Sequence, residues 1–349
     1  MTILYVSDQG ATLTKEGNRL IVQKMRKTVQ WVHAFKVEQI VLMGSISISP
    51  GAMAFLLQEG IDTVFLSIHG KYRGRLISEF GKNIDLRRLQ YRKIEDTGFR
   101  LKMARAQVKG KIDNCRVLLR RHNQELGKPE IDSVVHHLRV LGRQVPAAES
   151  IDTLMGLEGA AAAAYFGCFR HLIRVSDISF TGRNRRPPKD PVNVLLSLGY
   201  TLLANAVQTQ VHVSGLDPYL GCLHSPEYGR PSLVLDLMEE FRPVLVDALV
   251  FQLINKKMIR LTDFYRPEDR EPAAFDFAET EPVKEGYPIL LTYQGMKKFI
   301  TQFENRLSQK VLYEATGQRL DYKGVFLEQV RQWVRCLQSD GEYVPFQVR

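Results

Sequence analysis

The strongest constraint on the fold is a change of sequence pattern at about Asn83. Before it, short apolar runs alternate with turn residues, as in the run at residues 63–68 and the hairpin expected around residues 15–18. After it, residues 85–128 contain no proline and can form continuous helix. A chain of 349 residues is also longer than the commonest single domain. We therefore expect an α+β protein with a small β-rich N-terminal domain, residues 1–83, and a mainly α-helical domain, residues 84–349.

The N-terminal part has short strands at regular spacing, typical of a small sheet or sandwich. It contains no cluster of residues suited to catalysis, so we expect a scaffold or dimerisation module. In the helical part, helices are expected at residues 150–175, 192–213, 232–257, 293–316 and 322–338, with proline-bearing loops at 177–191 and 263–287.

The charge balance points to a polyanionic partner. The net charge is +10, which favours nucleic acid or an anionic membrane surface. Residues 87–121 carry twelve Lys or Arg side chains against three acids. This run is either a solvated helix face or a surface that follows phosphates. The membrane alternative is weak because no amphipathic helix has a distinct aromatic face.

The cysteines and the N-terminal residues indicate the cellular compartment of the protein. The four cysteines, Cys115, Cys168, Cys222 and Cys336, form no CxxC pair, which indicates reduced thiols rather than a zinc knuckle or a disulfide framework. The first residues lack the basic and apolar regions of a signal peptide. No apolar run approaches the roughly 20 residues that span a bilayer. We expect a cytoplasmic protein with no membrane association.

Glu158 is out of place on the helix expected at residues 150–175. Its neighbours on one face, at three- and four-residue spacing, include Leu154, Ala161 and Tyr165, which suit a core. An unpaired carboxylate in such a stripe would cost several kcal/mol or be forced neutral. Glu158 therefore needs a partner, which is either an arginine or a metal ion.

A second acidic group follows a histidine. His224 lies on a loop between two expected helices, and the next helix carries Asp236, Glu239 and Glu240. Asp236 and Glu239, three residues apart, project from the same side. These acids form either a solvated face near a helix N-terminus or a ligand cluster beside the histidine. Oxygen ligands with one imidazole suit Mg²⁺ or Mn²⁺, which can activate a hydroxyl and polarise a phosphoryl oxygen.

Four blocks of sequence carry a family resemblance. They are MGLEGAAAAAYFG at 155–167, RNRRPPKDPVNVLLSLGY at 183–200, GLDPYLGCLH at 215–224 and SLVLDLMEEFRP at 232–243. In this order they resemble the CRISPR adaptation integrase family, the first-numbered Cas protein, and the resemblance extends over nearly the whole chain. It implies a β-rich N-terminal domain, an α-helical catalytic domain and a homodimer that acts with the family's small second Cas protein.

The resemblance also implies roles for single residues. The family's metal-binding Glu, His and final acid fall on Glu158, His224 and Glu239, with Asp236 assisting the metal or the attacking group; Glu240 remains an alternative to Glu239. The implied reaction joins a 3′-hydroxyl end of double-stranded spacer DNA to a phosphodiester of the CRISPR repeat array by transesterification. Water in place of the hydroxyl gives endonuclease activity.

Phosphate contacts are expected from four arginines: Arg183, Arg185, Arg186 and Arg242. Surface ion pairs are the alternative for each of them. The competing function for the whole chain is a non-catalytic DNA-binding scaffold that uses the basic run and the arginine loop. It predicts salt-sensitive DNA binding without metal-dependent turnover.

Overall fold

The structure is a computed structural model, and it describes residues 2–78, 83–184, 187–225, 227–266, 289–339 and 341–348. The described residues form two compact units, the second of which begins at Asn83. The first is rich in strands and the second is mainly helical, so the α+β class expected from the sequence is confirmed. The roles expected for the two parts stay predictions.

The N-terminal unit contains two four-stranded sheets. The first has the order β1 (Thr2–Val6), β5 (Val37–Met43), β7 (Asp62–Leu66) and β8 (Tyr72–Leu76). Its first three strands are parallel and β8 is antiparallel to β7. The second has the order β4 (Lys27–His33), β3 (Arg19–Lys24), β2 (Thr12–Glu16) and β6 (Ser47–Ile48). The hairpin expected around residues 15–18 joins β2 and β3.

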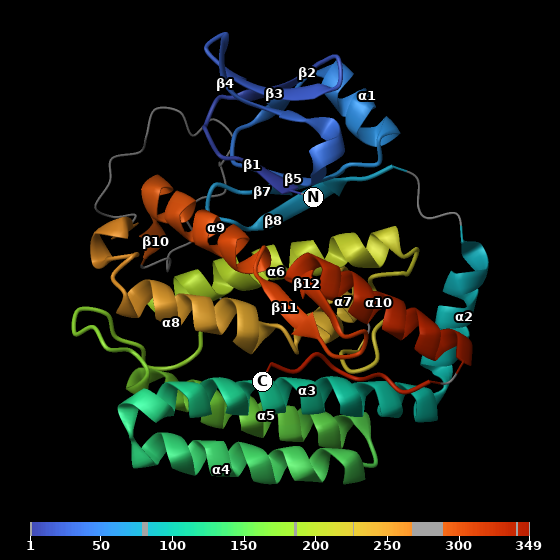
Figure 1. Ribbon diagram of the computed structural model, residues 1–349, viewed down its shortest axis with the longest axis vertical. Coiled ribbons are helices and arrows are strands. Elements are labelled where there is room, and N and C mark those ends of the chain that lie inside the picture. Colours follow the sequence, from blue (N-terminus) through green and yellow to red (C-terminus); the bar gives the residue numbers. More distant parts are fainter. Residues whose placement is uncertain are drawn as a thin grey trace. The chain divides into compact units, whose positions relative to one another are not determined.

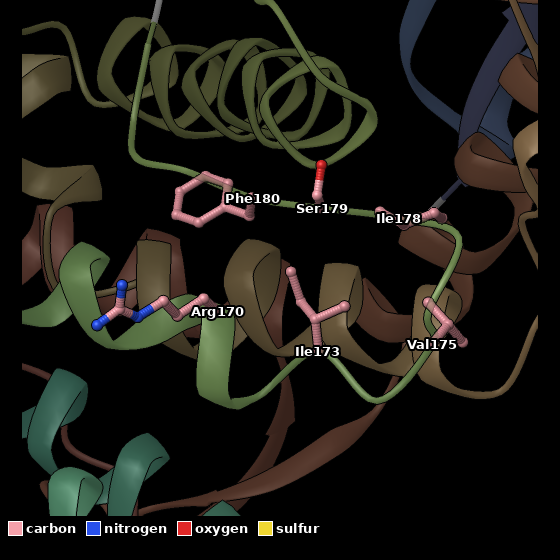
Figure 2. A pocket seen from close by; sticks show the side chains of 6 residues that line it. All are labelled: Arg170, Ile173, Val175, Ile178, Ser179 and Phe180. Carbon is pink, nitrogen blue, oxygen red and sulfur yellow. The ribbon is translucent and has the colours of Figure 1, made fainter.

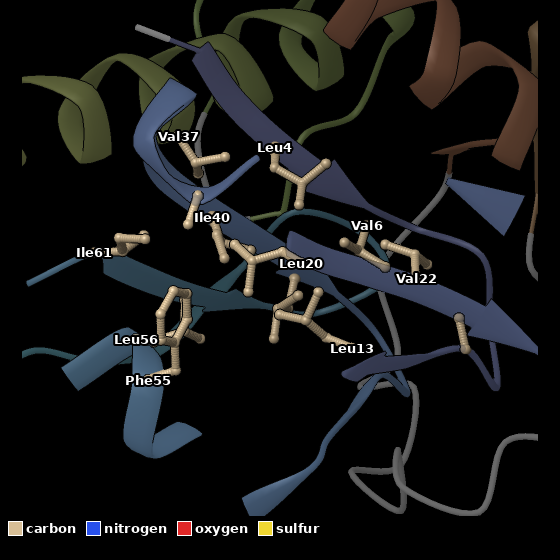
Figure 3. Close-up of a cluster of buried hydrophobic side chains, with 13 residues drawn as sticks. Leu4, Val6, Leu13, Leu20, Val22, Val37, Ile40, Phe55, Leu56 and Ile61 are labelled. Carbon is tan, nitrogen blue, oxygen red and sulfur yellow. The ribbon is translucent and has the colours of Figure 1, made fainter. Parts of the chain in front are cut away.

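One apolar core joins these two sheets. Leu4 and Ile40 from the first sheet, Leu13 and Leu20 from the second, and Leu56 of helix α1 (Pro50–Gln58) belong to a single buried cluster (Figure 3). Alternation along each strand sends these side chains inward. Burial of this apolar surface stabilises the unit.

The second unit is built mainly from helices (Figure 1). They are α2 (Ile84–Glu95), α3 (Thr97–Leu126), α4 (Pro129–Gln144), α5 (Ile151–Cys168), α6 (Pro191–Val213), α7 (Ser232–Met238), α8 (Ala248–Asn255), α9 (Tyr293–Leu307) and α10 (Tyr322–Ser339). Short antiparallel pairs join β9 (Phe264–Tyr265) to β10 (Leu290–Leu291) and β11 (Lys310–Tyr313) to β12 (Gln318–Asp321). Most of the loop expected at 263–287 lies outside the described residues.

Helix α3 is the longest element in the described part of the chain. It runs beside α4 and α5 (Figure 1). Asp96 starts it by accepting hydrogen bonds from the N–H groups of Gly98 and Phe99. Gly127, with φ of +61°, ends it in the left-handed conformation that favours glycine. Its buried face includes Met103, Gln107 and other residues at helical spacing.

Three expected helices are shorter than the sequence pattern indicates. The helix expected at 293–316 ends at Leu307, and residues 310–313 form strand β11 instead. Gly317, with φ of +67°, allows the tight turn that returns the chain to pair with β11. Helix α5 ends at Cys168, and a single 3₁₀ turn follows at Phe169–His171. The helix expected at 232–257 is interrupted after Met238 and resumes as the π-helical segment η4 (Arg242–Asp247) and then α8. Pro243 explains the break, because it has no N–H to donate to the carbonyl group four residues earlier.

Among the described residues, no helix is both long and apolar enough to cross a membrane. The cytoplasmic location stays a prediction.

Candidate active site

The acidic segment after α7 is buried. Asp236, Glu239, Glu240 and Asp247 are each at most 3% exposed. A solvated acidic face, one of the two readings of these residues, is therefore wrong. Glu239 and Glu240 lie in the turn between α7 and η4. The π-helical segment η4 follows directly, and such segments are often found at functional sites.

Glu158 and Glu239 converge on one positive charge. The ammonium of Lys111, on α3, forms an ion pair with Glu158 Oε1 and lies 2.5 Å from Glu239 Oε2. The other oxygen of Glu239 lies 3.2 Å from Arg242 Nη2. Burial alone would raise the pKa of the Glu239 carboxyl, but the charges of Arg242 and Lys111 bring that pKa down to about 2. Glu239 is therefore ionised at neutral pH.

The ammonium of Lys111 is buried with its partners. Its side chain is only 11% exposed. Burial lowers the pKa of Lys111, yet the negative charges of Glu239 and Glu158 raise that pKa above its ordinary value overall. The partner that the sequence required for Glu158 is thus a lysine rather than an arginine.

His224 is fixed by Asp236. The Nδ1 atom of His224 lies 2.6 Å from Asp236 Oδ1. The same carboxylate accepts hydrogen bonds from the backbone N–H groups of Cys222, Leu223 and His224. A proton on Nδ1 that is donated to Asp236 leaves the lone pair of Nε2 for a ligand. Protonation of His224 would lower the pKa of Glu239 further, so the two side chains share one electrostatic environment.

The histidine loop is pressed against two helices. A side chain at Gly221 would bring its Cβ within 2.7 Å of the backbone carbon of Ser232, at the start of α7. From the other side, Arg100 Nε on α3 donates to the carbonyl oxygen of Cys222 at 3.3 Å. The segment at residues 221–224 is therefore closely packed against α3 and α7.

Glu240 belongs to a different cluster. Its carboxylate accepts hydrogen bonds from Gln329 Nε2, the Tyr343 hydroxyl and the Phe346 N–H. Burial raises the pKa of Glu240 to about 8, against the opposing effect of these donors. It faces α10 and the C-terminal segment. Of the two adjacent glutamates, Glu239 is the one that shares the ammonium of Lys111 with Glu158.

A second buried acid lies behind the first group. Asp247 accepts hydrogen bonds from the hydroxyl groups of Tyr165, at 2.8 Å, and Tyr200, at 2.6 Å. Burial raises the pKa of Asp247 to about 6, although both hydroxyls act to lower it. The guanidinium of Arg242 lies 4.9 Å from the centre of the Tyr200 ring. Arg242 is thus fixed between Glu239 and Tyr200.

The four arginines expected to bind phosphate have different surroundings. Arg183 donates to Asn193 Oδ1 at 2.7 Å and to Ser197 Oγ at 3.3 Å, and it packs on Tyr200. Arg242 pairs with Glu239. Arg185 and Arg186 lie outside the described residues. Phosphate binding by these four side chains stays a prediction.

The basic run at residues 87–121 combines two kinds of side chain. Arg88, Arg92, Lys102, Arg120 and Arg121 are exposed. Other members turn inward, as Arg100 and Lys111 do, and the guanidinium of Arg105 donates to the carbonyl oxygen of Ala148.

The residues around Lys111 suit a hard divalent cation. Within the described part of the chain, no three His, Cys, Asp or Glu side chains are placed to hold a metal ion as they stand. However, two ionisable carboxylates from α5 and the end of α7 already meet at one cation, and the imidazole beside them is oriented through Nδ1. Such a donor set, two carboxylates and one imidazole, fits Mg²⁺ or Mn²⁺.

A separate pocket lies away from these carboxylates. It has a volume of about 230 Å³ and is lined by Arg170, Ile173, Val175, Ile178, Ser179 and Phe180 (Figure 2). Its lining is mostly apolar and includes neither a carboxylate nor a histidine. It therefore offers none of the groups that the buried site brings together.

Comparison with known proteins finds relatives over nearly the whole chain. A family model described as "CRISPR associated protein Cas1" matches residues 4–305. The "CRISPR-associated endonuclease Cas1 3" of Thermus thermophilus is 36% identical over 99% of this chain and 97% of its own length.

Two solved structures share the fold over the whole chain. A chain of a "Cas6-RT-Cas1–Cas2 complex" is 25% identical with a TM-score of 0.80, and the match covers 36% of that chain. A "Casposase bound to integration product" is 22% identical with a TM-score of 0.82 over 95% of its chain, which shows the fold alone. The family resemblance found in the four sequence blocks is confirmed.

Proposed function

The chain belongs to the Cas1 family of CRISPR-associated proteins, and on this premise we propose that Glu158, His224 and Glu239 are the divalent-metal ligands of a DNA endonuclease and integrase. The observation that carries the proposal is the convergence of Glu158 and Glu239, from separate elements, on one cation. His224, held through Nδ1 by Asp236, completes the set.

The proposed reaction is a transesterification in CRISPR adaptation. The terminal 3′-hydroxyl of a spacer DNA attacks a phosphodiester of the repeat array. A new P–O bond forms, the old one breaks, the attacking hydroxyl loses its proton, and the displaced array strand leaves with a 3′-hydroxyl. Water as the attacking group gives hydrolysis and hence endonuclease activity.

The residues of the site divide this work. A divalent ion, when bound, would supply Lewis-acid polarisation of the phosphoryl oxygen and of the attacking hydroxyl. Glu158, Glu239 and His224 Nε2 would hold it, and Asp236 orients the imidazole. Arg242, fixed on Tyr200, would supply positive charge to a phosphate as negative charge develops on it. Asp236 is therefore proposed as a positioning residue.

The partners follow from the family and from the charge. We expect double-stranded DNA, the small second Cas protein and a homodimer, with Mg²⁺ or Mn²⁺ as the ion. The related chain in the Cas6-RT-Cas1–Cas2 complex is part of an assembly with Cas2, which supports such a partner. The net charge of +10 supports DNA. Arg183, Arg185, Arg186 and Arg242 are proposed to contact its phosphates.

A joining assay tests this function. The protein is incubated with a duplex that has 3′-hydroxyl ends, a supercoiled plasmid that carries a repeat, and Mn²⁺, with and without the small Cas partner. Covalent joining is expected, and a duplex with 3′-deoxy ends should give none. Chelation should abolish the reaction.

One result would favour the competing function. Salt-sensitive binding of the plasmid, with neither joining nor nicking in Mn²⁺, would identify a non-catalytic DNA-binding scaffold.

A further inference from the structure

Lys111 occupies the point at which the two proposed acidic ligands meet. Its ammonium pairs with an oxygen of Glu158 and an oxygen of Glu239. The three side chains are 11%, 19% and 4% exposed, respectively, so water screens their charges weakly. Lys111 therefore contacts the same carboxylate oxygens that a divalent ion would need.

The charges of four side chains at this point balance one another without a metal. Glu158 and Glu239 contribute two negative charges, and Lys111 and Arg242 contribute two positive charges. Without Lys111, the two carboxylates would repel each other in a buried environment. With Lys111 in place, an added divalent ion would stand against an ammonium at contact distance and leave an excess of two positive charges. One of the two resident cations must therefore move when a divalent ion binds.

The surroundings of the two cations indicate which one moves. Arg242 pairs with Glu239 Oε1 and stacks on Tyr200, and its planar guanidinium is fixed from both sides. The ammonium of Lys111 is a point charge at the end of a flexible four-carbon chain. Both of its partners are the two carboxylates themselves.

We propose that Lys111 is a resident counter-cation of the site: it holds Glu158 and Glu239 together while no divalent ion is bound, and it withdraws from between them when the ion binds. This inference rests on the proposed function, because it takes the same two carboxylates as metal ligands. It makes Lys111 a positioning residue that sets how tightly the ion is bound.

Metal affinity tests this role directly. Mn²⁺ binding is measured for the wild type and for Lys111→Met, using the whole chain without DNA. The protein is titrated with Mn²⁺, and free Mn²⁺ is detected by electron paramagnetic resonance. Methionine keeps most of the length of the side chain but removes the competing charge. The dissociation constant for Mn²⁺ should fall by at least about tenfold in the variant. Its melting temperature without Mn²⁺ should be lower, and the rise in melting temperature on adding Mn²⁺ should be larger.

A matched control and a second variant sharpen the test. Lys109→Met removes the same charge two residues away, where Lys109 pairs with Asp113; its affinity for Mn²⁺ should stay within about twofold of the wild type, since its ammonium pairs elsewhere. Lys111→Arg replaces the ammonium by a guanidinium that binds carboxylates through two hydrogen bonds. This variant should bind Mn²⁺ more weakly than the wild type, and it serves if Lys111→Met does not fold.

The outcomes separate this inference from the proposed function. Mn²⁺ affinity that is unchanged or weaker in folded Lys111→Met, or unchanged in Lys111→Arg, overturns the role of Lys111. If the wild type nevertheless joins DNA in Mn²⁺, the proposed function stands without it. If the wild type neither binds Mn²⁺ nor joins DNA, and Lys111→Met also binds none, both proposals fail.

Discussion

The imidazole of His224 and the carboxylate of Asp236 form one unit, with Nδ1 and Oδ1 2.6 Å apart. The same carboxylate collects three backbone N–H groups from the loop that carries the histidine. Asp236 thus fixes both the position of the loop and the direction of the ring. We therefore expect Asp236 to act on the proposed metal ion through His224.

Replacement of Asp236 should weaken metal binding without removing a ligand. In Asp236→Asn, the amide cannot accept all the donors that now surround the carboxylate, so His224 loses its orientation. Affinity for Mn²⁺ and the rate of strand joining should both fall by about 10- to 100-fold. Glu227→Gln, an exposed acid on the same loop that pairs with Arg230, is the control. Equal Mn²⁺ affinities in the two variants would contradict the positioning role.

The three proposed ligands should be needed for chemistry and not for folding. Glu158→Gln, His224→Gln and Glu239→Gln should each lower strand joining and nicking in Mn²⁺ by at least about 100-fold. Gel-shift assays at fixed salt should show that each variant still binds DNA. Asp152→Asn, an exposed acid at the start of the same helix as Glu158, should join DNA at the wild-type rate. Full activity of all three ligand variants would refute the site.

Glu240 should make stability depend on pH. Burial raises its pKa from 4.5 to about 8, so the folded protein keeps a proton that the unfolded chain loses above about pH 4.5. This contribution to stability is full below pH 4.5 and is lost as the pH rises towards 8. In urea denaturation between pH 5 and pH 8, the free energy of unfolding of the wild type should fall relative to Glu240→Gln by on the order of 2 kcal/mol.

The comparison for Glu240 is a partly buried glutamate that pairs with an exposed arginine. Glu328→Gln on α10 removes an acid that pairs with Arg331 near the surface, so it should leave the pH dependence of the wild type unchanged. Parallel curves for the wild type and Glu240→Gln would show that Glu240 is ionised throughout this range.

Gly221 should tolerate no side chain. In Gly221→Ala the new methyl group meets the backbone of Ser232 and the carboxylate of Asp236. The loop must shift, which should lower the free energy of unfolding by about 1–3 kcal/mol and reduce strand joining. Gly159→Ala is a control in which the free energy of unfolding should rise, because the new methyl group there has no atom within 4 Å. It should stabilise helix α5 by about 0.5–1 kcal/mol, as measured by urea denaturation.

The acidic residues could be singled out from the sequence because each broke a pattern. Glu158 interrupts an apolar stripe, and that alone required a cationic partner. The partner, Lys111, could not be singled out because it lies in the basic run at residues 87–121, for which both interpretations from the sequence place the side chains on a surface. Yet Lys111 lies in the buried stripe of α3, four residues after Gln107 and three before Asn114. The three- and four-residue spacing that identified Glu158 on an apolar face would also identify Lys111, if the same spacing is examined on a highly charged helix.

The break at Pro243 shows a second feature that we did not predict from the sequence. The sequence indicated one helix at residues 232–257, although Pro243 stands in its middle and a proline there interrupts hydrogen bonding. With the break, Glu239 and Glu240 lie in a turn and face different partners. On a regular helix, adjacent residues differ by about 100° in direction, which does not say which one meets Glu158. That choice depends on α3 and α10, which lie far away in the sequence.

The C-terminal segment braces the turn that carries Glu239. Asn114 Nδ2 donates to the carbonyl oxygens of both Glu240 and Phe346, and the Phe346 N–H donates to the Glu240 carboxylate. The acidic turn and Phe346 are 106 residues apart in the sequence, so its support is a long-range contact. A change far along the chain, at Phe346, can therefore alter the position of Glu239 without touching any proposed ligand.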